Sequence, residues 1–182
     1  MYTGIVQAVR PLLAVNTYPG HKQFTLDLTP ELLDELKIGA SVSVEGTCLS
    51  VTEIDGTEVK FDAMNATLER TNLRCLKAGQ GVNIERSAKM NAEIGGHLMA
   101  GHIATTADIV ELSIQPTGAF IKFRMPPEWA KYVFPRGFLG VNGCSLTVDA
   151  PGAQSSNPAS AVDRTLNRSA GTAPACIRIA PP

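Results

Sequence analysis

The chain has 182 residues, of which 44% are hydrophobic, and its formal net charge is −1 at pH 7. This balance is typical of an ordinary soluble protein and lacks the basic excess that indicates nucleic-acid binding. No apolar run approaches the roughly 20 residues of a membrane helix, and the N-terminus has no signal-peptide pattern. The cysteines show no CxxC spacing, which indicates free thiols in a reducing cytoplasm; they are Cys48, Cys75, Cys144 and Cys176.

Short strands separated by turns dominate the first half of the chain. An alternation of apolar and polar residues predicts strands over residues 24–28 and within 41–62, where glycines supply the turns. A threonine N-cap followed by a proline predicts a short helix from residue 30. A second short helix is expected over residues 67–76. Residues 93–97 then form a natural junction to the second half.

The second half repeats this plan at a constant offset of 97 positions. The clearest pair is Gly-Thr-Cys-Leu-Ser-Val at residues 46–51 and Gly-Cys-Ser-Leu-Thr-Val at residues 143–148. An offset held over about 45 residues implies two copies of one structural unit. The repeat predicts further strands and one helix at matching places, namely strands over 103–114, 119–125 and 139–148, and a helix over 127–133.

Many short strands with few helices predict a mainly β protein of two tandem closed barrels, in domains 1–96 and 97–182. The last 34 or so residues break the pattern, because 149–182 is rich in Ala, Pro, Ser and Gly. The counterpart of strand 59–64 is placed at about 157–162, where a proline would cost a ladder hydrogen bond. The second barrel is therefore predicted to be incomplete, with 149–182 divergent and a candidate for disorder.

Phosphate-binding and metal-binding motifs are not apparent in the sequence. It has no glycine-rich loop of the P-loop or Rossmann type. His97 and His102 are five positions apart, which on a strand places them on opposite faces and makes them poor partners for one metal ion. We therefore expect no metal site.

The paired segments contain small polar side chains at alternate positions. Cys48 and Ser50 face one way on a strand, and so do Ser145 and Thr147 in the second copy, whereas the apolar residues beside them face the core. One interpretation is two strands with small polar residues facing water. The other, favoured by the duplication, is a pair of surfaces that grip two similar flat heterocycles.

Three other residues have a chemical and a structural interpretation. Cys48 is a candidate nucleophile or a buried inert thiol. His102, beside Gly101, is a candidate acid or base, or a histidine that makes an interdomain hydrogen bond. Tyr2 is either an ordinary residue near the terminus or an aromatic ring that stacks on a ligand.

Four segments together closely resemble riboflavin synthase of the alpha-chain type: residues 1–7, 46–52, 93–102 and 143–148. The run Gly-Gly-His-Leu-x-x-Gly-His at residues 95–102 is the most specific of these signals. The resemblance covers residues 1 to about 150. It implies two six-stranded Greek-key barrels with short helices in each barrel, and a transferase that uses no metal or organic cofactor.

The activity that this resemblance implies is the last step of riboflavin biosynthesis. Two molecules of 6,7-dimethyl-8-ribityllumazine dismutate, and one gives a four-carbon unit to the other. The products are riboflavin and 5-amino-6-(ribitylamino)pyrimidinedione. The resemblance also implies a cytoplasmic homotrimer, with each site between the first barrel of one chain and the second barrel of a neighbour, and an association with lumazine synthase.

Site residues follow from the resemblance by motif. Ser41, Cys48 and His102 are expected to assist proton transfer or water activation, and Tyr2 to stack on a ligand ring. The first pocket is expected to contain Gly4, Ile5, Val6, Cys48, Leu49, Ser50, Asp62, Ala63, Met64, Asn65, Ala66 and Thr67. The second pocket is expected to contain Gly101, His102, Ile103, Arg136, Ser145, Leu146 and Thr147.

This sequence departs from the family pattern at single residues and in the tail. Tyr2 replaces a usual Phe, Ser50 a usual Thr and Arg136 a usual Lys, and the last of these keeps the charge but changes the geometry. The closing strand and the C-terminal helix of the family are not recognisable in 149–182. Two alternatives to the enzyme therefore remain: a non-catalytic lumazine- or flavin-binding homologue, and a folded but inactive truncated product.

Overall fold

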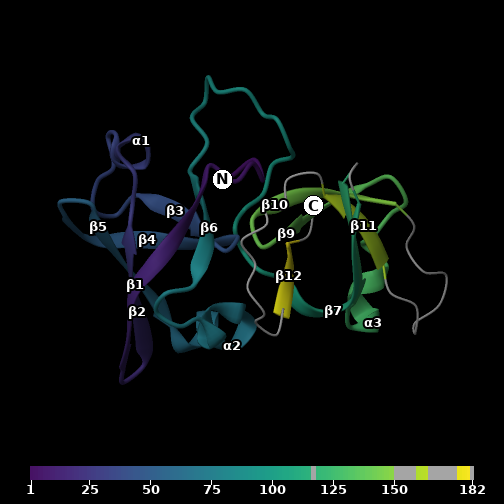
Figure 1. Ribbon diagram of the computed structural model, residues 1–182, viewed down its shortest axis with the longest axis horizontal. Coiled ribbons are helices and arrows are strands. Elements are labelled where there is room, and N and C mark those ends of the chain that lie inside the picture. Colours follow the sequence, from purple (N-terminus) through teal and green to yellow (C-terminus); the bar gives the residue numbers. More distant parts are fainter. Residues whose placement is uncertain (116–117, 150–158, 164–175, 181–182) are drawn as a thin grey trace.

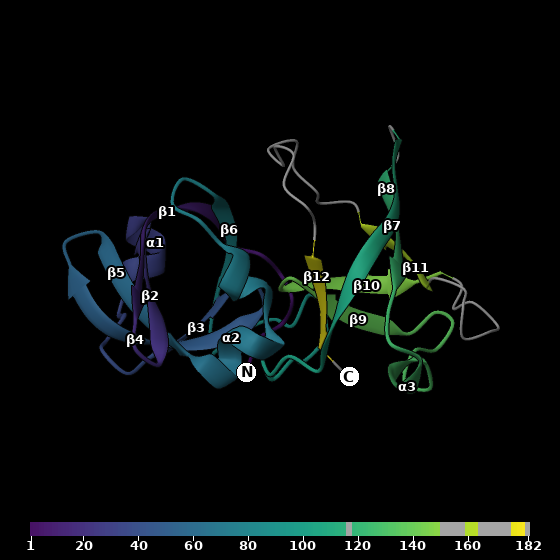
Figure 2. The ribbon, with the colours of Figure 1, turned by 90° about the horizontal axis from the view of Figure 1, so that it is seen from below.

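The computed structural model describes residues 1–115, 118–149, 159–163 and 176–180. Two closed six-stranded barrels lie side by side along the chain (Figures 1 and 2). The first barrel contains β1 (Ala8–Tyr18), β2 (His21–Asp27), α1 (Pro30–Leu33), β3 (Ser41–Val44), β4 (Thr47–Asp55), β5 (Glu58–Met64), α2 (Asn65–Arg70), the 3₁₀ helix η1 (Asn72–Cys75) and β6 (Gly81–Arg86). The second contains β7 (Thr105–Gln115), β8 (Gly118–Arg124), α3 (Pro127–Ala130), β9 (Phe138–Val141), β10 (Cys144–Val148), β11 (Ala159–Asp163) and β12 (Cys176–Ala180).

The two barrels share one strand order. The first ring runs β1-β2-β5-β4-β3-β6, and the second runs β10-β11-β8-β7-β12-β9, which is the same ring entered at a different strand. Neighbouring strands are antiparallel throughout. The mainly β class and the pair of six-stranded barrels are therefore confirmed.

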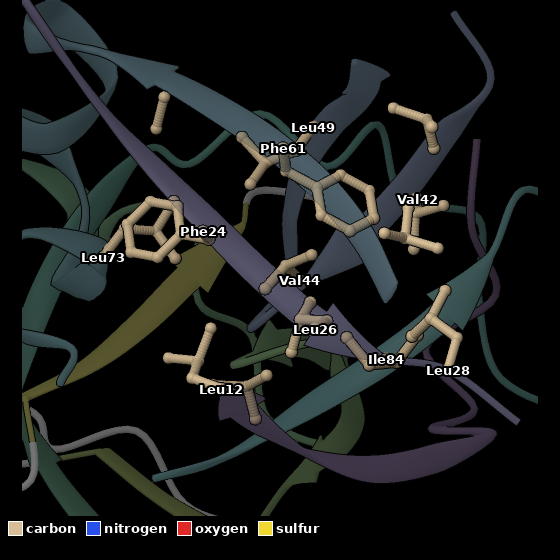
Figure 3. Packing of buried hydrophobic residues seen from close by; sticks show 14 of the residues in the cluster. Leu12, Phe24, Leu26, Leu28, Val42, Val44, Leu49, Phe61, Leu73 and Ile84 are labelled. Atoms are coloured by element: carbon tan, nitrogen blue, oxygen red, sulfur yellow. The ribbon is translucent and has the colours of Figure 1, made fainter. Parts of the chain in front are cut away.

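The core of the first barrel consists of the inward residues of its strands and of side chains from its helices (Figure 3). Phe24, Leu49 and Phe61 are 4% exposed or less. Leu68 of α2 and Leu73 of η1 close one end of the same cluster. Burial of each such side chain contributes about 1.5–3 kcal/mol, so this cluster is the main source of stability of the first unit.

The strand pairing of the second barrel corrects the repeat alignment in the tail. Ile121 of β8 pairs with Ala161 of β11, as its counterpart Phe24 pairs with Phe61 in the first barrel. The counterpart of Val59–Ala63 is therefore Ala159–Asp163, so the strand begins directly after the proline that was predicted to interrupt it. In the second barrel an alanine thus stands at the strand position that Phe61 occupies in the first.

The ring of the second barrel is complete but closes through few residue pairs. Among the described residues, two pairs join β10 to β11 and two join β9 to β12. The corresponding contacts of the first barrel have four pairs, between β4 and β5, and three pairs, between β3 and β6. The predicted weakness of this unit is therefore present as thin closure rather than as missing strands. The rest of the divergent tail, 150–158, 164–175 and 181–182, lies outside the described residues.

Several elements differ from the sequence prediction, and β6 and β12 lie outside the predicted strands. β1 was not predicted, because Pro11 and many exposed positions hide its alternation. The helix predicted over 67–76 is divided at Thr71, whose φ of −128° is extended, into α2 and η1. No helix among the described residues is long and apolar enough to span a membrane.

An approximate twofold axis relates the two barrels. Tyr2 and Met99, which are 97 positions apart, exchange backbone hydrogen bonds of 2.8 and 2.9 Å. Gly46 and Gly143 have the same separation and are in contact, since a Cβ on Gly46 would lie 2.5 Å from the backbone nitrogen of Gly143. Both glycines end two-residue turns with positive φ at both positions. Equivalent residues therefore meet at the junction of the barrels.

Candidate functional site

The outer face of the first barrel presents Cys48 and Ser50 side by side on β4. The flanking residues Leu49 and Val51 are buried in the core, so the alternation predicted for this strand is present. Ser41 lies opposite Ser50 on β3, which places its side chain on the same face. The face continues onto β5, where Asp62 accepts a hydrogen bond of 3.1 Å from the Gln23 amide.

The end of β5 and the start of α2 border this face. Met64, Asn65 and Ala66 are exposed, and Thr67 is half-buried. Ala63 and Leu49, in contrast, point into the core at 1% and 4% exposure. Of the residues predicted for the first pocket, these two can offer a ligand their backbone but not their side chain.

A segment of the second unit crosses to this face. The backbone N–H of Cys48 donates to the Gly101 carbonyl at 2.9 Å. Gly101 has a φ of +77°, and a Cβ there would lie 2.7 Å from the Tyr2 ring and 2.8 Å from the Cys48 Cβ. Only glycine permits this approach. The next residues, the exposed His102 and the half-buried Ile103, therefore lie beside the first barrel.

The reciprocal crossing occurs at the second barrel. The backbone N–H of Ser145 donates to the Gly4 carbonyl at 2.8 Å, and Gly4 also has a φ of +77°. A Cβ on Gly4 would lie 2.7 Å from the Ser145 Cβ. The exposed Ile5 and half-buried Val6 follow it.

These crossings correct the grouping made from the sequence. Residues 4–6 were assigned to the pocket of Cys48, and residues 101–103 to the pocket of Ser145. In the structure the two segments are exchanged. The cause is the backbone pairing of Tyr2 with Met99, which carries each segment across the approximate axis to the other barrel.

The second face repeats the first with fewer described contacts. Ser145 is half-buried and Thr147 exposed on the outer side of β10, while Leu146 is buried at 3% exposure. Arg136 is exposed in the turn before β9, with a φ of +61°, and its backbone N–H donates to the Val148 carbonyl at 2.8 Å.

Tyr2 does not lie on the surface as a stacking platform. Its side chain is 1% exposed and is enclosed between the barrels, with its ring against Gly101. Burial raises the pKa of the Tyr2 phenol, and the neighbouring Cys48 thiol raises it further. The predicted stacking on a ligand would require Tyr2 to leave this position.

Two residues that the sequence interpretation missed support the crossing segments. Glu85 is 3% exposed and accepts hydrogen bonds from the Thr3 N–H at 2.6 Å, the Thr3 hydroxyl at 2.8 Å and the Gly4 N–H at 3.0 Å. His97, considered above only as a metal ligand, has its Nδ1 2.6 Å from the Ser145 Oγ. For Glu85, the available signal was an acidic side chain beside buried residues of a strand. The sequence carried no signal for the hydrogen bond between His97 and Ser145.

A groove of about 920 Å³ runs along the crossing segment of the first unit. It lies between residues 3–8, α1 and the residues that follow β6, and Glu85 forms part of its wall. Among the predicted site residues only Ile5 lines it. Within the described part of the chain, no cluster of His, Cys, Asp and Glu side chains is arranged to hold a metal ion.

Comparison with known proteins places this geometry in a family. The sequence matches the lumazine binding domain family twice, over residues 3–87 and 100–173. Riboflavin synthase of Escherichia coli (strain K12) is 45% identical over 149 residues, which cover 81% of this chain and 70% of that protein. Riboflavin synthase of Saccharomyces cerevisiae is 32% identical over 157 residues, which cover 81% of this chain and 65% of that protein.

Solved structures agree on the fold. The crystal structure of LumP complexed with riboflavin superposes with a TM-score of 0.86 over 98% of both chains, at 20% identity. The complex of LumP with 6,7-dimethyl-8-(1'-D-ribityl) lumazine gives a TM-score of 0.83 over the same shares, at 21% identity. With two matches to the lumazine binding domain and relatives at this level of identity, the chain belongs to the riboflavin synthase family.

Proposed function

We propose that this chain is a riboflavin synthase, which converts two molecules of 6,7-dimethyl-8-ribityllumazine into riboflavin and 5-amino-6-(ribitylamino)pyrimidinedione. The observation that carries the proposal is the reciprocal crossing of the two glycine segments. It gives each barrel an outer face of small polar side chains bordered by backbone from the other unit. Two equivalent faces suit a reaction whose two substrates are the same molecule.

The first face is proposed to bind one lumazine. Its polar groups are Cys48, Ser50 and the Asp62 carboxylate that Gln23 orients, and residues 64–67 and 101–103 form its rim. Ser41, Cys48 and His102 are proposed to move protons there. Since Cys48 is half-buried and His102 exposed, both are accessible to a ligand that lies on β4.

The second face is proposed to bind the other lumazine between Ser145, Thr147 and residues 4–6, with Arg136 at its edge. Much of the rate acceleration would come from holding the two rings in register, since positioning alone can contribute about 7–11 kcal/mol to a bimolecular reaction. The remainder would come from proton transfers at the acidic ring methyl group.

Assembly into a homotrimer is part of this proposal. Within one chain the paired segments around Tyr2 and Met99 lie between the Cys48 face and the Ser145 face. Two lumazines on one chain would therefore be kept apart by protein. A neighbouring chain that brings its second barrel against the first barrel would remove this barrier. Cytoplasmic location, association with lumazine synthase and the domain division 1–96 and 97–182 complete the proposal.

The direct test is to incubate the purified chain with the lumazine and to measure riboflavin and the pyrimidinedione by chromatography. We expect one riboflavin for every two lumazines consumed. The double variant Ser50→Ala, Thr147→Ala keeps both cores intact and is expected to lower the rate. Tight lumazine binding without riboflavin formation would contradict the enzymatic proposal.

A non-catalytic lumazine- or flavin-binding protein is the second candidate. The thin closure of the second barrel favours it, because an unstable second face would leave one working pocket. The ligand stoichiometry separates the candidates, since the enzyme binds two lumazines per chain at saturation and the single-pocket protein binds one.

A further inference from the structure

The two equivalent positions Cys48 and Ser145 have different surroundings. Cys48 neighbours Tyr2, whose pKa is raised by burial and whose buried hydroxyl has no hydrogen-bond partner among the described residues. The Ser145 hydroxyl lies 2.6 Å from Nδ1 of His97, an imidazole that can accept a proton. The approximate symmetry of the barrels is therefore broken at the two side chains best placed to touch a ligand.

His97 is held firmly in this position. Its backbone N–H donates to the Thr3 carbonyl at 2.9 Å, and its ring stacks on Phe138 with the centroids 4.2 Å apart. Gly96 allows the close approach, since a Cβ there would lie 2.1 Å from the Thr3 carbonyl oxygen and 2.8 Å from the Ser145 Cβ. The side chain is 6% exposed, so its contact with Ser145 is shielded from water.

The state of the imidazole suits an acceptor. Burial lowers the pKa of His97, and no charged group contributes to the shift, so the ring is neutral at neutral pH. Phe138, which stacks on the ring, and Thr3 and Gly96, which adjoin the His97 backbone, carry no charge. The other nitrogen, Nε2, is buried and has no hydrogen-bond partner within the described residues. Ser145 is thus the described group that determines the tautomer of the ring.

We propose that His97 is a positioning residue of the second face: it accepts the hydroxyl hydrogen of Ser145 and so turns the Ser145 oxygen into the acceptor for a proton of the lumazine ring methyl. In this step the methyl C–H bond breaks and its electron pair remains on the lumazine. The proton goes to the Ser145 oxygen, and the Ser145 proton passes to Nδ1 of His97. The inference rests on the proposed function and assigns the molecule that becomes the carbanion to the second barrel.

A first measurement tests the hydrogen bond without substrate or turnover. The imidazole nitrogen resonances of His97 are recorded by NMR in the wild-type chain and in Ser145→Ala. We expect Nδ1 to be a hydrogen-bonded acceptor in the wild type and to shift in the variant. Unchanged resonances in Ser145→Ala would overturn the inference.

A double-mutant cycle tests the role through Ser145. His97→Phe keeps the stack on Phe138 and removes the acceptor, and the readout is enzyme-dependent incorporation of deuterium from D2O into the lumazine methyl. We expect a loss of about 10²-fold in this rate, with lumazine affinity within about 3-fold, as for removal of a proton-transfer group. In the Ser145→Ala background the same change should add less than about 2-fold. Multiplicative losses would show that His97 acts independently of Ser145 and would overturn the proposal.

Two further variants serve as a second test and as a control. His97→Asn offers a smaller polar group that can contact Ser145 but cannot take up the proton, so it should fold and still lose methyl exchange even if His97→Phe does not fold. His21→Phe is the matched control, because His21 stacks on Tyr18 in the hairpin of the first barrel and should leave exchange unchanged. Methyl exchange that depends on His97 without riboflavin formation would contradict only the proposed function. Riboflavin formation at the wild-type rate in His97→Asn would contradict only this inference.

Discussion

Single residues at the junction of the barrels determine which groups can meet there. Gly101 and Gly4 allow backbone from one unit to contact β4 or β10 of the other, because no Cβ separates them from Cys48 or Ser145. The same two residues have a positive φ, a backbone conformation that residues with a side chain rarely adopt. The candidate site therefore depends on two glycines that carry no reactive group.

Gly101→Ala is expected to destabilise the protein more than a change of backbone preference explains. A left-handed alanine costs about 1–2 kcal/mol. Gly56→Ala is the control that measures this cost alone, because Gly56 has a φ of +57° and no atom within 4 Å of the place where a Cβ would lie. At Gly101 the clash with Tyr2 and Cys48 adds to it. Urea unfolding of both variants measures the difference, and equal losses would contradict the close contact.

The stability of the chain should depend on His97 in mildly acidic solution. Burial lowers the pKa of His97 below its ordinary value of 6.5, so the unfolded chain binds a proton that the folded chain does not. Stability is then complete above about pH 6.5 and decreases as the pH falls below it, down to the folded pKa. Urea unfolding at pH 7.5 and 5.5 should show a smaller loss in His97→Asn than in the wild type. A loss of the same size in the variant would exclude His97 as the cause.

At the scale of elements, the second barrel is a weaker copy of the first. β11 and β12 occupy the places of β5 and β6 in the barrel, but within the described ranges each pairs with one of its neighbours through two residue pairs. Ala161 replaces Phe61 at the corresponding position, which removes a large apolar side chain from the pattern.

Native-state hydrogen exchange should therefore divide the strands by barrel. We expect the amides of β11 and β12 to exchange faster than those of β5 and β6, since local opening follows pairing and buried contacts. The measurement is deuterium uptake resolved by peptide under native conditions. Equal protection of β6 and β12 would contradict the difference in closure.

Much of the fold was predictable from the sequence, and the reasons are local. Strand alternation around Leu49 and Val51, and its return at Leu146 and Val148, indicated two copies of one strand-rich unit because a strand has a period of two. β1 was not predictable, because Pro11 and its exposed positions remove that period.

The composition of each pocket was less predictable. A repeat offset shows which residues are equivalent, but it does not show which copy of a segment lies beside which strand. The exchange of residues 4–6 and 101–103 depends on the pairing of Tyr2 with Met99, a contact between two short segments without any periodic pattern. The partner of Glu85 was hidden for the same reason, since its bonds go to the backbone of Thr3 and Gly4 rather than to a complementary charge.

At the scale of the whole molecule, catalysis is expected to require association. Each chain would present two faces that its own crossing segments separate. Specific activity should fall when the protein is diluted below the concentration at which the chains dissociate, because only the assembled protein would be active. Sedimentation velocity over the same range measures the assembly. Constant activity in a chain that sediments as a monomer would contradict a site shared between chains.

The contact of Gly46 with Gly143, together with the mutual pairing of Tyr2 and Met99, has the form of an isologous dimer interface, in which a patch meets its own copy. Such self-complementarity is what two separate identical subunits would need in order to bind each other. Because the two copies here belong to one chain, the two sides of this self-complementary contact can carry different residues, as Cys48 and Ser145 do.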